Sequence, residues 1–346
     1  PEPNALAIKT PLGTILHTGD WKIDPDPQIG SATDVKGLTA LGDEGVLAMV
    51  CDSTNVFEEG ESGSEESVKQ GLIELIAEQK QAVAVTTFAS NVARVKSIVE
   101  AAELAGRAVC LVGRSMHRIT DAAKSVGILP PHMEFVDESE ASQIPAEHIL
   151  YLCTGSQGES RAALTRISRR DHRNVSLHKG DTVIFSSRQI PGNEKGIFAL
   201  QNALAEQGVR VITPRMVPYP IHVSGHPCRD ELRRMYGWVR PKVSVPVHGE
   251  RRHIMEHATF AKSLQVPHAV TPQNGSLVRL APGKAEITDL VPAGRLFLDG
   301  DRLVPEGAQG IEERRKLSWS GILFASMTLD EDGDILDGPV VIAKGL

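Results

Sequence analysis

Carboxylates and histidines that follow apolar segments are the residues of this sequence best suited to chemistry. Asp20 ends the tetrapeptide 17–20, where a carboxylate can reach a metal ion as a hard oxygen ligand. His248 directly follows the apolar segment 243–247 and precedes a glycine, a position that suits a nitrogen ligand. Each has an ordinary alternative, an aspartate that caps a turn and a histidine hydrogen-bonded at a strand end. Asp20 and His248 are therefore candidate metal ligands that only the fold can bring together.

A second group of residues suits an anion. The segment His222-Val223-Ser224-Gly225-His226, called the phosphate segment below, leads into a helix expected near Arg229. Backbone N–H groups and the dipole at a helix N-terminus favour an anion, and Ser and His side chains can donate to it. The alternative is a polar loop with two surface histidines. We predict that this segment binds a substrate phosphate.

Further polar residues stand at junctions between an expected strand and an expected helix. Ser90, Asn91 and Ser156 are the candidates for substrate binding, and similar junctions occur at Arg114 and Arg188. A single junction of this type is equally typical of a helix N-cap. Several of them in one array predict a shared polar cleft, provided that the strands are parallel.

The composition excludes several classes of protein. A formal net charge of −7 argues against a histone-like protein that binds nucleic acid by overall charge. No apolar run approaches the roughly 18 residues that a membrane span requires. The four cysteines, Cys51, Cys110, Cys153 and Cys228, form no CxxC pair, which argues against disulfides and a cysteine zinc site and fits a reducing cytoplasm. We expect a globular protein with a sizeable core.

Alternating short apolar strands and amphipathic helices must position these residues. The pattern opens with a hairpin over 5–10 and 14–18 and a strand over 45–52. Strands are then expected at 82–88, 108–112, 149–153, 182–186, 209–213 and 243–247. Helices are expected after the polar stretch 58–66, with Ser64 or Ser67 as N-cap, and at 91–105, 115–125, 161–168, 194–207, 229–239 and 251–264. This rhythm predicts an α/β fold with a parallel sheet flanked by helices. The chain begins at Pro1 and stops within an apolar pattern, so we expect a sequence truncated at both ends.

The ordered set of motifs resembles ribonuclease J, a member of the β-CASP branch of the metallo-β-lactamase fold. The motifs that carry the resemblance are His17-Thr18-Gly19-Asp20, Asp52-Ser53-Thr54-Asn55, Thr87-Phe88-Ala89-Ser90-Asn91, Thr154-Gly155-Ser156-Gln157-Gly158, His222-Val223-Ser224-Gly225-His226 and Pro246-Val247-His248-Gly249-Glu250. The resemblance implies a partial metallo-β-lactamase-like β/α sandwich with an inserted β-CASP domain. Its parts are a metallo-β-lactamase-like part at 1–62, a β-CASP domain at 63–219, a return segment at 220–295 and C-terminal strands at 296–346 that lead to a missing domain.

The resemblance also assigns roles to particular residues. Asp20 and His248 match ligands of two divalent ions, zinc or manganese, and His226 matches a catalytic proton donor or a neighbour of the metal site. The phosphate segment matches the part that holds a substrate phosphate. Asp299 matches a position linked to a structural calcium ion in some members.

The activity that the resemblance implies is metal-dependent hydrolysis of RNA, by 5′-to-3′ exonuclease and endonuclease action. It also implies work in RNA decay and rRNA processing in the cytoplasm, a homo-oligomer (dimer or tetramer), an RNA-degradation complex as partner, and no membrane. Two alternatives stay open, a β-CASP nuclease acting on DNA and a non-catalytic RNA-binding scaffold. A small-molecule metallo-hydrolase is less favoured because it would not need the inserted domain. The metal and the balance of exonuclease and endonuclease action stay undetermined.

The sequence departs from the family at one motif. The family's His-x-His-x-Asp-His signature supplies most metal ligands, and none of the twelve histidines has that spacing. Truncation explains this better than evolved loss, because Asp20, His226 and His248 are all present. We therefore expect the chain by itself to have at most a half-formed metal site and little or no nuclease activity.

Overall fold

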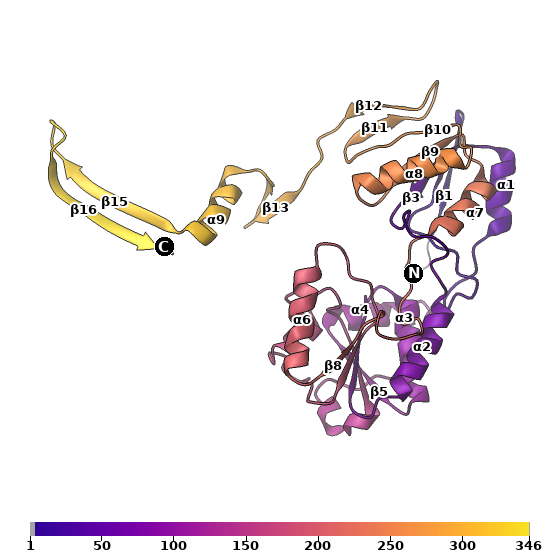
Figure 1. Cartoon of the computed structure of the whole chain (residues 1–346), viewed down its shortest axis with the longest axis horizontal. Coiled ribbons are helices and arrows are strands. Elements are labelled where there is room, and N and C mark those ends of the chain that lie inside the picture. Colours follow the sequence, from indigo (N-terminus) through magenta and orange to yellow (C-terminus); the bar gives the residue numbers. More distant parts are fainter. Residues whose placement is uncertain (1–3, 346) are drawn as a thin grey trace. The chain divides into compact units, whose positions relative to one another are not determined.

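The computed structural model describes residues 4–345 and divides into two compact units. The larger unit runs to Pro272 and includes Leu280–Glu286, and the smaller one comprises Gln273–Arg279 and Ile287–Leu346. Figure 1 shows both units, with many of their helices and strands labelled. None of the helices in the described residues is long and apolar enough to cross a membrane.

The first sheet of the larger unit has the order β1-β2-β3-β9-β10. Its strands are β1 (Leu6–Thr10), β2 (Gly13–His17), β3 (Val46–Asp52), β9 (Val243–Val247) and β10 (His268–Ala269). The hairpin β1–β2 is antiparallel, whereas β2, β3, β9 and β10 are parallel to one another. The helices α1 (Val35–Glu44), α7 (Arg229–Val239) and α8 (Arg251–Ser263) surround this sheet in Figure 1, and apolar side chains of all three contribute to one core with Leu16 and Met49.

The second sheet is fully parallel and has the order β5-β6-β4-β7-β8. Its strands are β4 (Val83–Thr86), β5 (Ala108–Val112), β6 (Ile149–Cys153), β7 (Thr182–Phe185) and β8 (Arg210–Ile212). The helices are α2 (Glu65–Ala77), α3 (Val92–Leu104), α4 (Arg114–Ser125), α5 (Ala163–Ser168) and α6 (Glu194–Glu206), with short 3₁₀ turns at Ala141–Gln143 and Ala146–His148.

Alternation along each strand explains how both faces of the second sheet are covered. Val83 and Val85 pack into one core with α2 and α3, while Ala82 and Ala84 pack into another core with α5 and α6. Successive side chains of a strand point to opposite faces, so an almost continuous apolar run fits a strand buried on both sides. The predicted α/β class with a parallel sheet is confirmed. Cys51, Cys110 and Cys153 lie in strands as small buried residues.

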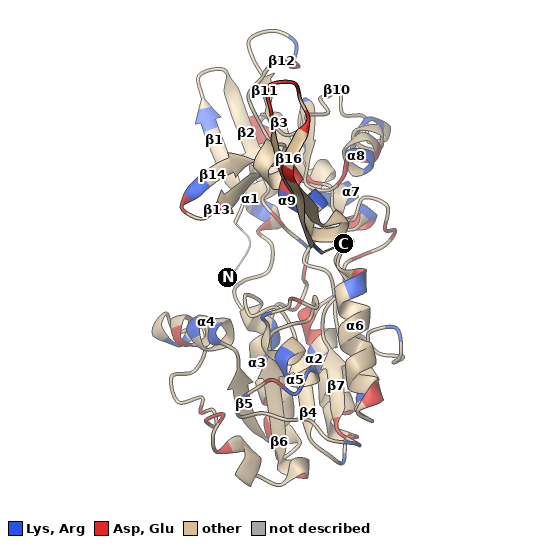
Figure 2. Ribbon diagram, turned by 90° about the vertical axis from the view of Figure 1, so that its left-hand side faces the viewer, with Lys and Arg blue, Asp and Glu red and all other residues tan. Residues whose placement is uncertain are grey.

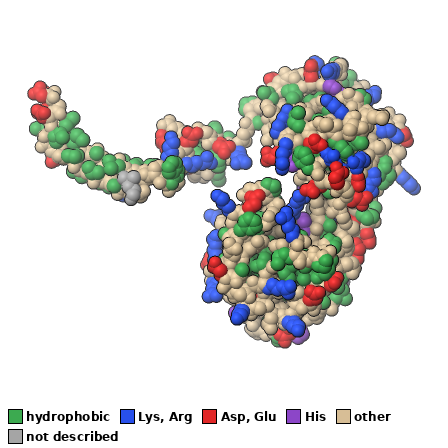
Figure 3. Space-filling view, in the orientation of Figure 1, with side chains coloured by type: hydrophobic (Ala, Val, Ile, Leu, Met, Phe, Trp, Pro, Cys, Tyr) green, Lys and Arg blue, Asp and Glu red, His purple; other side chains and the backbone are tan. Residues whose placement is uncertain are grey.

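The smaller unit consists of two-stranded sheets and one helix. Its elements are β11 (Ser276–Arg279), β12 (Glu286–Leu290), β13 (Leu296–Asp299), β14 (Arg302–Pro305), α9 (Gln309–Ser320), β15 (Ile322–Leu329) and β16 (Ile335–Lys344). β15 and β16 are exposed along their whole length apart from Ile322, and Figure 3 shows hydrophobic side chains on their surface.

Two helices were not predicted, and both have a physical reason. α1 contains two glycines, Gly37 and Gly42, which lower the helix propensity of its sequence, and none of its residues is fully buried. Its Gly42 lies so close to α7 that an added Cβ would meet the carbonyl oxygen of Trp238 at 2.1 Å, which shows that tertiary packing holds it. α9 lies within 296–346, where only strands were expected. It is exposed, and its few apolar residues do not repeat at helical spacing.

Candidate metal and phosphate site

Parallel pairing brings the carboxyl ends of β2, β3 and β9 to one edge of the first sheet. Asp52 is the last residue of β3 and stands opposite Val247 of β9, so the next residue of that chain, His248, lies beside it. Asp20 follows β2 by a short turn. Ligand atoms of Asp20, Asp52 and His248 all lie within 4.8 Å of one another. His248 Nδ1 is 2.9 Å from Asp20 Oδ1 and 3.7 Å from Asp52 Oδ1.

This arrangement fits a divalent metal ion. Two carboxylates and one imidazole directed at one point form a donor set that suits zinc or manganese. The structure thus brings the predicted ligands Asp20 and His248 together and adds Asp52, which sequence reasoning missed. The sequence contained a feature that could have identified Asp52 as a ligand, because Asp52 begins the motif 52–55 at the end of a buried strand. The sequence analysis assigned it no role.

His248 itself has a strained backbone. Its φ is +64°, in the left-handed region, and Gly249 follows with φ +85°. A residue with a Cβ that is held there costs on the order of 1–3 kcal/mol, and such strain is concentrated at functional sites. The turn therefore directs the imidazole toward the two carboxylates at a local cost in stability.

Asp52 also holds the candidate catalytic histidine. Its Oδ2 is 2.6 Å from His226 Nδ1, and its Oδ1 accepts hydrogen bonds from Thr54 N and Oγ1. Burial alone would raise the pKa of Asp52, but the hydrogen bonds and charge of His226, with Thr54, outweigh it and lower that pKa. The same hydrogen bond raises the pKa of His226, against the opposing effect of burial. His226 is partly exposed, so it can exchange a proton with a bound substrate.

Asn55 is a second residue that the sequence analysis missed. Its Nδ2 donates to Ser224 Oγ at 2.8 Å and to the backbone oxygen of His226 at 2.9 Å. Ser224 Oγ in turn accepts from the backbone N of His226. Asn55 therefore fixes the shape of the phosphate segment beside Asp52. Near it, Arg188 Nη1 lies 3.3 Å from Asn55 Oδ1.

The other predicted substrate-binding residues make local contacts. Asn91 Oδ1 accepts from the backbone N of Arg94 and caps α3, while Ser90 is exposed in the preceding turn. Ser156 is buried, with its Oγ 3.5 Å from Gln157 Nε2. Their substrate contacts stay predictions.

Asp299 belongs to the smaller unit. Its two carboxylate oxygens accept from Arg314 at 2.7 and 2.6 Å. The calcium role suggested for this position stays a prediction, and an ion there would have to compete with this ion pair.

Comparisons with known proteins agree with this geometry. Residues 80–204 match the family described as "Ribonuclease J, beta-CASP domain", and residues 215–270 match "Zn-dependent metallo-hydrolase RNA specificity domain". The chain is 48% identical over its whole length to a ribonuclease J of Sinorhizobium meliloti and covers 61% of that protein. It is 39% identical over its whole length to one of Corynebacterium glutamicum, covering 48%, and 34% identical over 96% of its length to one of Thermus thermophilus, covering 58%.

Fold and site together define a β-CASP metallo-hydrolase, with a carboxylate–histidine cluster at the edge of its first sheet and a parallel β-CASP sheet. More particularly, the chain belongs to the ribonuclease J family, as its sequence motifs indicated. It spans about half to three-fifths of the length of these curated relatives.

Proposed function

We propose that this chain forms part of the active site of a metal-dependent ribonuclease that hydrolyses RNA phosphodiester bonds by 5′-to-3′ exonuclease and endonuclease action. The observation that carries the proposal is the convergence of Asp20, Asp52 and His248, with His226 hydrogen-bonded to the same Asp52. Bound divalent ions would activate water and offset charge on the phosphate. We further propose two ions, zinc or manganese, since a half-site of three donors leaves room for further ligands.

The chain's own residues would bind, orient and exchange protons. The phosphate segment would hold a substrate phosphate through Ser224 and backbone N–H groups. His226, held by Asp52, would donate or accept a proton at the reacting oxygen. Asn55 would fix the positions of Ser224 and His226 relative to each other. We also propose a cytoplasmic dimer or tetramer that acts in RNA decay and rRNA processing, within an RNA-degradation complex.

The charge distribution supports RNA binding at a local site and not through the overall charge of the protein. Figure 2 shows acidic and basic residues interspersed on the elements, with basic residues on α4 and α8. A net charge of −7 gives no long-range attraction for RNA. Metal ions, together with Arg94, Arg188 and Lys22 near His222, would then supply positive charge where a phosphate binds.

Metal removal provides the test. The whole protein and the 346-residue chain are each incubated with labelled RNA and DNA oligonucleotides, with manganese or zinc and with a chelator. We expect the whole protein to cleave RNA only with metal, and the chain alone to show little or no cleavage. Preferential DNA cleavage would instead support the DNA alternative, and RNA binding without cleavage would support the scaffold alternative. Strong, chelator-sensitive cleavage by the chain alone would show that cleavage does not need the His-x-His-x-Asp-His motif.

A further inference from the structure

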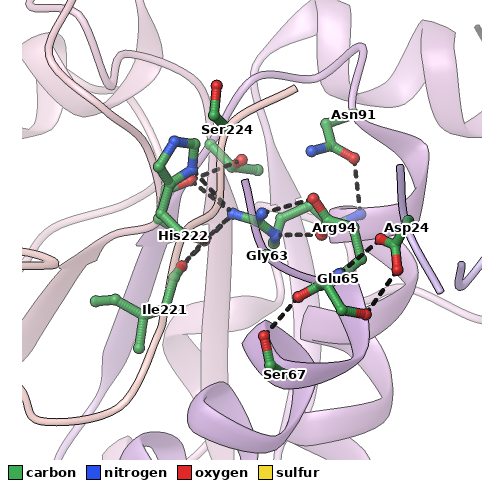
Figure 4. Close-up of polar contacts among 12 residues, drawn as sticks. Asp24, Gly63, Glu65, Ser67, Asn91, Arg94, Ile221, His222 and Ser224 are labelled. Carbon is green, nitrogen blue, oxygen red and sulfur yellow. Dashed lines mark hydrogen bonds and ion pairs between the residues drawn. The ribbon is translucent and has the colours of Figure 1, made fainter. Parts of the chain in front are cut away.

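Arg94 is a fully buried arginine surrounded by polar atoms (Figure 4). Its Nε and Nη2 donate to the two carboxylate oxygens of Glu65, each at 2.9 Å. Its Nη1 donates to Ser186 Oγ at 2.7 Å and to the backbone oxygen of Ser186 at 3.1 Å. The guanidinium, carried on α3, is thus fixed by two other parts of the chain, α2 and Ser186, which directly follows β7.

Stability alone does not account for such a pair. Removing two charges from water offsets most of their attraction, and apolar residues of similar volume often stabilise a core as well or better. A bidentate arginine–carboxylate pair does, however, fix position and orientation more closely than apolar packing. A geometric role is therefore the better explanation for Arg94 and Glu65.

The guanidinium lies where the phosphate segment begins. Nη1 is 3.4 Å from His222 Nδ1 and 3.5 Å from the backbone oxygen of Ile221. Ser186 Oγ donates to that same oxygen of Ile221 at 2.7 Å. Arg94 and Ser186 together therefore hold the two residues that lead into Ser224 and His226.

Glu65 extends the same network toward the metal cluster. Its backbone N donates to Asp24 Oδ2 at 2.9 Å, and Lys22 Nζ lies 3.1 Å from that oxygen. Both residues follow the metal-ligand candidate Asp20 within the same loop. One continuous set of contacts thus joins the loop of Asp20 to the start of the phosphate segment.

His222 needs this orientation because it carries no charge. Burial, followed by the positive charges of Arg94, Arg188 and Lys22, lowers the pKa of His222 to about 3. A neutral imidazole attracts phosphate only through hydrogen bonds, whose strength falls steeply when the angle is wrong. Its position therefore matters more than its charge.

We propose that Arg94, paired with Glu65, is a positioning residue that holds His222 and the phosphate segment in register with Asp20 and His226. The inference deepens the proposed function and rests on it. Arg94 itself need not contact the substrate. Its loss should weaken substrate binding even where the fold is kept.

The test uses the whole protein and an RNA oligonucleotide. Arg94→Lys keeps the charge but loses the bidentate fork, and the double variant Arg94→Met/Glu65→Leu removes both charges, so that no unpaired charge is left buried. The matched control is Arg107→Lys. Arg107 is also buried, but its guanidinium donates to the backbone oxygens of Gln79, Gln81 and Ile149, at the amino ends of the strands.

We expect both Arg94 variants to raise KM on the order of tenfold, with a much smaller change in kcat, and to weaken oligonucleotide binding in chelator by a similar factor. The double variant should keep this defect while melting close to the wild-type protein, and Arg107→Lys should lower the melting temperature with an unchanged KM. A wild-type KM in the double variant would overturn the inference, as would an equal rise in Arg107→Lys. A wild-type protein that cleaves no RNA would refute the proposed function instead, and the binding measurement would still test Arg94.

Discussion

A single carboxylate, Asp52, connects two kinds of chemistry at the residue scale. One of its oxygens faces His248 and accepts from Thr54, and the other is hydrogen-bonded to His226. The residue is completely buried, so its orientation is fixed by these partners. A metal ion and a proton-transferring histidine can therefore be held at a set distance from each other.

Replacing Asp52 by Asn should weaken metal binding by about 10- to 100-fold, because a charged ligand becomes neutral while the shape is kept. Calorimetric titration of the whole protein with zinc or manganese measures the change. Asp43→Asn is the control, since Asp43 is an exposed carboxylate paired with Arg240. Equal metal affinity in the two variants would exclude Asp52 from the ligand set.

A fully buried histidine, His257, sets a pH dependence of stability. Its Nδ1 lies 2.8 Å from Ser53 Oγ and its Nε2 lies 2.9 Å from the hydroxyl of Tyr236, and burial lowers its pKa to about 4. The unfolded chain takes up this proton near pH 6.5, so the stabilising contribution is complete above pH 6.5 and is lost as pH falls toward 4.

Between pH 7.5 and 5 this histidine should remove about 2 kcal/mol from the free energy of unfolding. Urea denaturation at pH 7.5 and at pH 5 measures this decrease in the free energy of unfolding. In the His257→Gln variant the decrease should be about 2 kcal/mol smaller than in the wild-type protein. The stability of that variant should still depend on pH in part, because the pKa of His222 is also lowered. His178→Gln is the control, because the His178 side chain is 80% exposed. An unchanged pH dependence in His257→Gln would show that His257 does not titrate in this way.

At the scale of the element, helix α3 places Arg94 and depends on its N-cap, the residue that precedes the helix. Asn91 was predicted to bind substrate, and in the structure its side-chain oxygen caps the helix by accepting from Arg94 N at 3.0 Å. Replacing Asn91 by Ala should cost about 1 kcal/mol in the free energy of unfolding, and Asn91→Asp should restore most of it.

Chemical denaturation together with RNA binding separates the two roles of Asn91. A cap affects the unfolding free energy and leaves the affinity of the folded protein nearly unchanged. A large loss of affinity in Asn91→Asp, with normal stability, would favour direct substrate contact.

On the scale of the whole molecule, the described hydrophobic cores lie between Leu16 and Val266, within the larger unit. β15 and β16 contribute no buried side chain. Removing residues 296–346 should therefore leave the melting temperature of the larger unit within about 2 °C, since little apolar surface is lost. Differential scanning calorimetry of the shortened chain checks this. A much larger drop would mean that the smaller unit stabilises the larger one.

The strand and helix alternation and the family were predictable from the sequence alone. Apolar periodicity is a local property, so β3, β9, α6 and α7 fell close to their expected bounds. Short motifs such as 222–226 keep their residue order wherever the fold puts them, which is why the resemblance to ribonuclease J was visible before the structure.

Only the tertiary structure decided which residues share the site. Asp52 joins His248 because β3 pairs in parallel with β9 in one register, across nearly 200 residues of chain. A shift of one residue would turn Asp52 to the other face, and no local pattern specifies that register. Likewise, Asn91 at a strand–helix junction has the same residue type whether it caps a helix or contacts a ligand. The candidate ligands Asp20 and His248 were therefore predictable as types, whereas their convergence on Asp52 depended on long-range strand pairing.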